Sequence, residues 1–134
     1  MTAQQIKTTP DPFETYLISQ AFSVGDLVIT SGQAAITLDG ELVGAGDFDA
    51  QAEQVFRNLS AVLEAAGSSL DKVIKVTIYL TDMANFPKIV ALRERFFSVP
   101  YPADTIVEVQ ALALAELEIE IEATAIISGE KHAA

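Results

Sequence analysis

The sequence predicts an α+β fold, in which two helices pack on one face of a mixed β-sheet in the order β-β-β-α-β-α-β-β. Three observations favour it. Residues 52–66 carry apolar side chains at spacings of three and four, which is typical of an amphipathic helix. Residues 73–80 and 117–127 alternate apolar and polar residues, which is typical of strands. Strand segments outnumber helical ones, so a doubly wound β-α repeat is not expected.

The first half of the chain is expected to be mostly strand. A β-rich run from Tyr16 to Val24 leads into a Gly-Asp turn, and Leu27–Thr30 follows as a buried strand. Residues 34–43 then predict a hairpin around Asp39-Gly40. Residues 1–134 are expected to form one domain, with 1–12 and 128–134 as loose termini.

The second half supplies both helices. The first is expected from Asp49 to a C-terminal Gly67, where glycine commonly ends helices. The second spans residues 85–97, with a proline in its first turn, where proline is tolerated. Strands are expected at 73–80, 105–109 and 117–127.

Composition excludes several classes of function. The formal net charge is −11, with eight Lys and Arg residues, so nucleic acid and anionic membrane surfaces should be repelled. The chain has no cysteine, which excludes disulfides and thiolate chemistry. No apolar run is long enough to span a membrane, and the polar first ten residues do not resemble a signal peptide. We expect a cytoplasmic protein.

The apolar content predicts self-association. Half of the residues are hydrophobic and the mean hydropathy is +0.32, which is high for a lone domain of 134 residues. A subunit interface is the simplest place for the excess apolar surface.

Four glutamates alternate with apolar residues near the C-terminus: Glu116, Glu118, Glu120 and Glu122. Period-two alternation places them on one face of a strand. A solvated acidic face is one interpretation. The other is that one of them lies in a pocket, where burial and like charge would raise its pKa and suit it to acid–base work. The pattern alone does not identify which one.

Other catalytic and metal-binding arrangements are missing. The single histidine, His132, lies in the expected tail, and Ser31 has neither a G-x-S-x-G elbow nor a histidine to activate it. No P-loop, dinucleotide fingerprint or metal-binding spacing is present. We therefore expect no metal and no cofactor.

Five segments, in order, resemble the RidA family, also called YjgF or endoribonuclease L-PSP. The resemblance spans about residues 16–127, and its matching segments are LVITSGQ (27–33), NLSAVLEAAGSSL (58–70), DKVIKVTIYLTDM (71–83), PADTIVEV (102–109) and LEIEIEATA (117–125). The resemblance implies a chorismate-mutase-like fold and a homotrimer with a small-molecule pocket between subunits. It also implies cofactor-independent deamination of enamines and imines, giving a 2-oxo acid and ammonia.

The residues implied by the resemblance are only partly kept. The catalytic glutamate is Glu120, and Ser31 and Gly32 of the S-G-Q turn are kept as substrate-binding residues. Thr105 stands where a serine is usual, and Ile18 and Val90 stand where the family has a tyrosine and an asparagine.

The largest departure is Asp104, which replaces the arginine that binds the substrate carboxylate in the family's P-A-R-S segment. A carboxylate there repels another carboxylate instead of binding it through two hydrogen bonds. If Asp104 shares a pocket with Glu120, the ligand should be cationic or neutral. Tyr16 is a candidate to replace the missing tyrosine, and Arg93 and Arg95 are candidates to replace the arginine.

Three functions follow as hypotheses. The first is a deaminase or hydrolase acting on an enamine, imine or other small amine, but not a standard 2-iminobutanoate deaminase. The second is a trimer that binds a small metabolite without turnover. The third is a ribonuclease, as the older family name suggests, and the charge of −11 argues against it.

Overall fold

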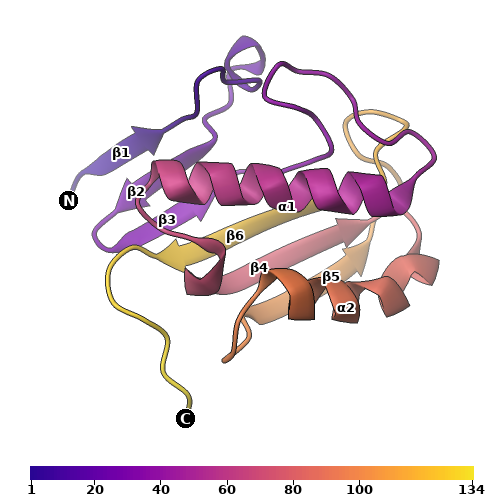
Figure 1. Ribbon diagram of the computed structural model, residues 1–134. Coiled ribbons are helices and arrows are strands. Elements are labelled where there is room, and N and C mark those ends of the chain that lie inside the picture. Colours follow the sequence, from indigo (N-terminus) through magenta and orange to yellow (C-terminus); the bar gives the residue numbers. More distant parts are fainter.

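The computed structural model describes residues 1–134 as a six-stranded sheet with both long helices on one face (Figure 1). This confirms the predicted α+β class. The sheet order is β1-β2-β3-β6-β4-β5. The elements are β1 (Ala3–Ile6), β2 (Ala21–Val24), β3 (Leu27–Thr30), α1 (Phe48–Ala65), β4 (Val73–Leu80), α2 (Phe86–Phe96), β5 (Ala103–Glu108) and β6 (Ile119–Ile126), with 3₁₀ turns η1 (Glu14–Tyr16), η2 (Leu70–Lys72) and η3 (Met83–Asn85).

The last strand joins the two halves of the sheet. β6 lies between β3 and β4 and is antiparallel to both. Strands β4 and β5 are parallel, and the chain between them forms α2. Side chains of β6 alternate between a buried set that faces α1 and a half-buried set on the opposite face. The sheet therefore has one face covered by helices and one open face.

Helix α1 supplies seven of the 22 buried residues of the core. Asp47 caps its first turn by accepting a hydrogen bond from the Ala50 amide, at 3.1 Å. The apolar stripe of the helix packs against the buried residues of β6 and β4. Phe56 of α1 stacks on Phe96 of α2, with ring centroids 4.3 Å apart, and contacts Phe97 edge-on. This aromatic cluster fixes α2 beside α1.

The N-terminal prediction was wrong in two respects. Residues 3–6, expected to be loose, form edge strand β1, which pairs with β2 in register Ala3↔Val24. The run from Tyr16 is not a strand before Ala21, because residues 14–16 form a 3₁₀ turn that ends at Leu17 with a left-handed φ of 60°. Alternation of residue types does not reveal such a turn.

The predicted hairpin at residues 34–43 is reduced to a single bridge, Ile36↔Leu42. The buried amide of Asn58 on α1 holds this segment by donating hydrogen bonds to the carbonyls of Ala34 and Ile36, at 2.9 and 2.6 Å. The segment thus combines these side-chain bonds with a few backbone bonds of its own, such as Thr37 to Glu41 and Val43 to Ala35, in place of a regular strand ladder. Neither helix is long and apolar enough to cross a bilayer.

Candidate functional site

The carboxyl group of Glu120 lies directly over Gly32. Glu120 is on the open face of β6, and Gly32 lies in the segment that leaves β3. A Cβ atom built on Gly32 would come 2.7 Å from Cδ of Glu120 and 2.9 Å from Cγ. Only glycine leaves room for the glutamate side chain in this position. The sequence prediction that grouped these two residues thus matches their placement.

Burial raises the pKa of the Glu120 carboxyl above its ordinary value, and the neighbouring charge of Glu122 raises it further. Each cause disfavours the ionised form. A carboxyl group tuned in this direction is better suited to accept and return a proton near neutral pH than an exposed one.

Ser31 lies beside Gly32 and is fixed by the chain that precedes β2. Its hydroxyl donates a hydrogen bond to the carbonyl of Ser19, at 2.6 Å, and its amide donates to the carbonyl of Gln20, at 2.8 Å. Ile18 directly precedes Ser19, so the structure brings Ile18, Ser31 and Gly32 to the end of the sheet where Glu120 lies. We refer to Ile18, Ser31, Gly32 and Glu120 as the glutamate half-site.

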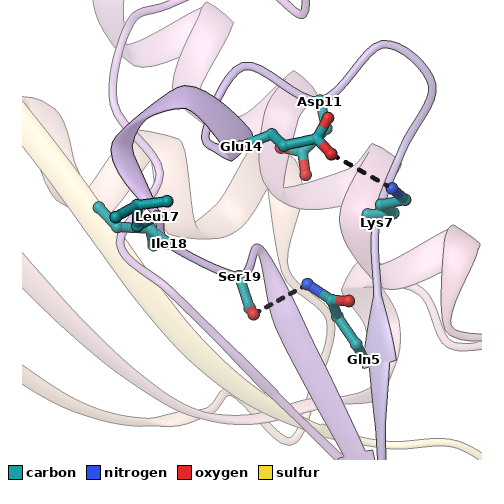
Figure 2. Close-up of a pocket in the computed structure, with 7 residues that line it drawn as sticks. All are labelled: Gln5, Lys7, Asp11, Glu14, Leu17, Ile18 and Ser19. Carbon is teal, nitrogen blue, oxygen red and sulfur yellow. Dashed lines mark hydrogen bonds and ion pairs between the residues drawn. The ribbon is translucent and has the colours of Figure 1, made fainter.

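Ile18 also lines a small polar hollow beside β1 (Figure 2). Its volume is about 150 Å³, and it is closed on two sides by the Lys7–Glu14 ion pair and by a hydrogen bond from Gln5 to Ser19. Both ion-pair side chains are more than half exposed, and the pair is 3.9 Å apart. We assign no chemistry to this hollow, because its groups are solvated and Glu120 does not line it.

Sequence reasoning missed a polar row on the open face of the sheet. The Tyr79 hydroxyl donates a short hydrogen bond to the Glu122 carboxylate, and this bond raises the pKa of the tyrosine hydroxyl. Thr105 lies on the same face, where its hydroxyl accepts a hydrogen bond from Lys75, at 2.9 Å. Alternation places each residue on a face, but only the strand order makes β4 the neighbour of β6.

A second hollow lies between α2 and β5 and has a volume of about 540 Å³. Two expected site residues, Val90 and Asp104, line it. We call it the α2–β5 groove; its lining residues are Phe86, Val90, Arg93, Glu94, Tyr101, Pro102, Asp104 and Ile106. It combines apolar walls with three charged side chains.

Within one chain, Asp104 and Glu120 do not share a pocket. Asp104 has the same parity on β5 as Ile106, which packs against the helix-side core, whereas Glu120 is on the open face. Asp104 instead accepts two hydrogen bonds from Arg93 of α2: from Nε to Oδ2 at 2.9 Å and from Nη2 to Oδ1 at 3.0 Å. The structure therefore places a guanidinium beside position 104, although the strand residue itself is an aspartate.

The other expected substitutes do not reach a half-site. Tyr16, the candidate for the missing tyrosine, lies at the end of η1 and is 75% exposed. Arg95 binds Glu53 of α1, at 2.8 Å, and lies over the ring of Phe96.

The acidic row is divided by its contacts. Glu118 lies before β6 begins, where its amide donates a hydrogen bond to the Gln51 side chain at 2.8 Å. Glu122 is engaged by Tyr79, which leaves Glu120 as the glutamate over Gly32. No group of three or more His, Asp or Glu side chains in the structure is arranged to hold a metal ion.

The fold and the glutamate half-site define a class: small α+β proteins with a half-buried carboxyl beside an S-G-Q turn. The chain belongs to the family described as Endoribonuclease L-PSP, whose model matches residues 6–127. It is 43% identical, over 81% of its length, to the RutC family protein y4sK of Sinorhizobium fredii, and the match covers 86% of that relative.

Two further relatives relate the chain to the RidA branch. One, from Dermatophagoides farinae, is described as 2-iminobutanoate/2-iminopropanoate deaminase; identity is 35%, with 84% of this chain and 88% of that one covered. The crystal structure of RidA from the Antarctic bacterium Psychrobacter sp. PAMC 21119 superposes with a TM-score of 0.83 at 40% identity, covering 92% of this chain and 99% of that one.

Proposed function

We propose that this protein is a cofactor-independent deaminase or hydrolase that acts on a C–N bond of an enamine, an imine or another small amine. The observation that carries the proposal is the Glu120 carboxyl, seated over Gly32 with a raised pKa. The deaminase among its relatives supports the same reaction class.

The chemistry needs one group that moves protons. Glu120 accepts a proton from water as the water oxygen bonds to the imine carbon, which gives a carbinolamine. It returns that proton to the imine nitrogen, and it then moves the hydroxyl proton of the carbinolamine to the same nitrogen as the C–N bond breaks, so that a carbonyl product and ammonia leave. Ser31 and the backbone at Gly32 position the substrate beside this carboxyl.

The pocket is proposed to form between subunits of a homotrimer. The open face of the sheet exposes an apolar pair, Phe22 and Ile29, at 42% and 48%, and no element of the chain covers it. The glutamate half-site and the α2–β5 groove lie on opposite faces, so a second copy is needed to bring them together. Sedimentation of the purified protein should give three times the mass of one chain.

Mixing two inactive variants tests this arrangement. Glu120→Gln removes the proton acceptor, and Val90→Trp fills the groove. Refolding them together in equal amounts should restore roughly a quarter of wild-type activity, because one pocket in four then combines an intact Glu120 from one subunit with an intact groove from its neighbour. Activity that stays at the level of the single variants contradicts the shared pocket.

The substrate is proposed to differ from 2-iminobutanoate. Asp104 occupies the strand position where RidA deaminases have an arginine, and Arg93 neutralises it from α2. A 2-imino acid whose nitrogen is neutral carries a carboxylate but no cation, so it would pair with Arg93 and be repelled by Asp104. The net charge of −11 supports a small molecule, and not nucleic acid or membrane, as the partner, and we propose a cytoplasmic location.

An imine-hydrolysis assay tests the function. An amino-acid oxidase generates the 2-imino acid, and hydrolysis is followed for wild type, Glu120→Gln and the reversed pair Arg93→Asp/Asp104→Arg. We expect slow wild-type turnover, loss of it in Glu120→Gln, and a gain in the reversed pair, which returns a guanidinium to β5 while keeping its partner. Full wild-type rates that do not depend on position 104 contradict the proposed difference in substrate.

The alternative is a trimer that binds a small metabolite without turnover. Glu120→Gln distinguishes the two functions, because it abolishes turnover in an enzyme and changes only affinity in a binding protein. The raised pKa of Glu120 favours the enzyme, since a binding site gains nothing from a group tuned to exchange protons.

A further inference from the structure

The ion pair between Arg93 and Asp104 is the most enclosed in the protein. Its side chains are 25% and 17% exposed, whereas each of the other four ion pairs has a partner that is at least half exposed. The backbone of Asp104 lies on β5, an edge strand with no neighbour on its outer side. The Asp104 side chain is therefore covered chiefly by Arg93. The guanidinium carbon also lies 6.0 Å from the ring centroid of Phe86. These contacts hold a guanidinium and a carboxylate side by side in the α2–β5 groove.

Each member of the pair keeps unused hydrogen-bonding capacity. A guanidinium has five N–H donors. Asp104 uses the Nε donor and one on Nη2, so three donors remain, two of them on the edge formed by Nη1 and Nη2. Each carboxylate oxygen of Asp104 accepts one of these bonds and has a further lone pair. The groove thus presents free donors of a cation next to free acceptors of an anion.

We propose that the α2–β5 groove binds a zwitterionic amino compound with an apolar side chain. The ligand carboxylate accepts hydrogen bonds from the free edge of Arg93, and its ammonium group donates to Asp104. Its side chain lies against the apolar walls formed by Phe86, Val90 and Tyr101. This inference names the ligand class of the site proposed above and rests on that proposal for the role of the groove.

Charge complementarity selects against simpler ligands. A ligand with only a carboxylate pairs with Arg93 but is repelled by Asp104 and Glu94. A ligand with only an amine pairs with these carboxylates but is repelled by Arg93. Only a ligand that carries both charges pairs with both members. The groove volume of about 540 Å³ falls in the usual range of small-molecule sites, about 300–1,000 Å³. An amino acid with an aromatic or branched side chain fits within it.

Three probes with the same phenyl group separate the contributions. L-phenylalanine carries both charges, 3-phenylpropanoate lacks the ammonium group, and 2-phenylethylamine lacks the carboxylate. We expect L-phenylalanine to bind wild-type protein at least about tenfold more tightly than either other probe in isothermal titration calorimetry, because each of them loses a charge-assisted contact.

Two variants assign the contacts. Arg93→Gln should abolish L-phenylalanine binding. Asp104→Asn should weaken L-phenylalanine to the level of 3-phenylpropanoate while leaving 3-phenylpropanoate bound as well as, or better than, in wild type. Circular dichroism and sedimentation verify that both variants fold and assemble. Equal binding of L-phenylalanine and 3-phenylpropanoate to wild type, or unchanged L-phenylalanine binding in Asp104→Asn, overturns the proposal.

Binding and turnover fail separately. If L-phenylalanine binds as described but Glu120→Gln has no catalytic phenotype on any imine, the ligand class stands and the proposed enzyme does not. If imines are hydrolysed through Glu120 while neither groove variant affects binding or turnover, the enzyme stands and the groove assignment is overturned.

Discussion

Replacing Gly32 by alanine should displace the Glu120 carboxyl with little effect on the rest of the fold. The new Cβ would lie 2.7 Å from Cδ of Glu120, whereas carbon atoms in contact are about 3.5–4.0 Å apart. The backbone beside it cannot yield easily, because Gln33 and Ile121 exchange two hydrogen bonds, at 2.8 and 3.0 Å. The glutamate side chain must therefore move by about 1 Å.

The expected cost follows from this displacement. Overpacking in a well-packed region costs about 1–3 kcal/mol of unfolding free energy, and the flexible glutamate places Gly32→Ala near the lower end. A displacement of about 1 Å at a reacting group lowers the rate by about a hundredfold. We expect kcat/KM to fall by that order while the protein still folds.

A double-mutant cycle separates the clash from the general effect of alanine on the chain. Gly32→Ala is measured by urea denaturation in wild type and in Glu120→Ala, where the clashing atoms are gone. Alanine restricts the unfolded chain equally in both backgrounds, so this contribution cancels. We expect a cost in the wild-type background and none in the Glu120→Ala background. Equal costs in both refute the steric account.

Three further predictions concern stability. Phe56→Ala should lower the unfolding free energy in urea by about 3–5 kcal/mol, because it removes a buried ring stacked on Phe96. Asp47→Ala should cost about 1 kcal/mol in the same assay, since the Ala50 amide loses its cap, whereas Asp47→Asn should retain most of it. Glu120→Gln should stabilise the protein at neutral pH. Because the pKa of Glu120 is raised in the folded state, the folded protein binds a proton there more readily than the unfolded chain does. The unfolding free energy of wild type therefore falls as pH rises from the unfolded-state pKa of 4.5 through the folded-state pKa, and glutamine avoids this loss. This gain should vanish in thermal melts below pH 4.5, and a gain that is independent of pH would contradict the assigned cause.

Much of the fold could be predicted because its strongest elements are locally determined. Helix α1 has a continuous apolar stripe, and β4 alternates from Lys75 to Leu80, so the local sequence is enough to predict each element. The sheet order could not be obtained this way. Alternation assigns β6 a buried face, but nothing local places it between β3 and β4. Strand β1 was missed because its four residues are mostly exposed and show no alternation.

In the candidate site, too, the sequence predicts individual residues but not the contacts between them. Gly32 and Glu120 were grouped through a resemblance, and the steric relation between them appears only when β3 and β6 are neighbours. The sequence suggests Arg93 only as a replacement for the arginine and does not predict its pairing with Asp104, because residues eleven positions apart on a helix and a strand have no fixed spacing. The contact depends on the parallel placement of β5 and on how α2 packs, which are both tertiary features.

The ion pair changes what the aspartate at position 104 means. Taken alone, Asp104 adds one negative charge to a site and repels a carboxylate. Paired with Arg93, it contributes no net charge and instead orients a guanidinium that keeps three free donors. Compared with the arginine that the family resemblance implies at position 104, the guanidinium here comes from the helix and has an acceptor beside it. A ligand that satisfies both must itself carry both charges, so the specificity of this chain is expected to follow the pair and not either residue alone.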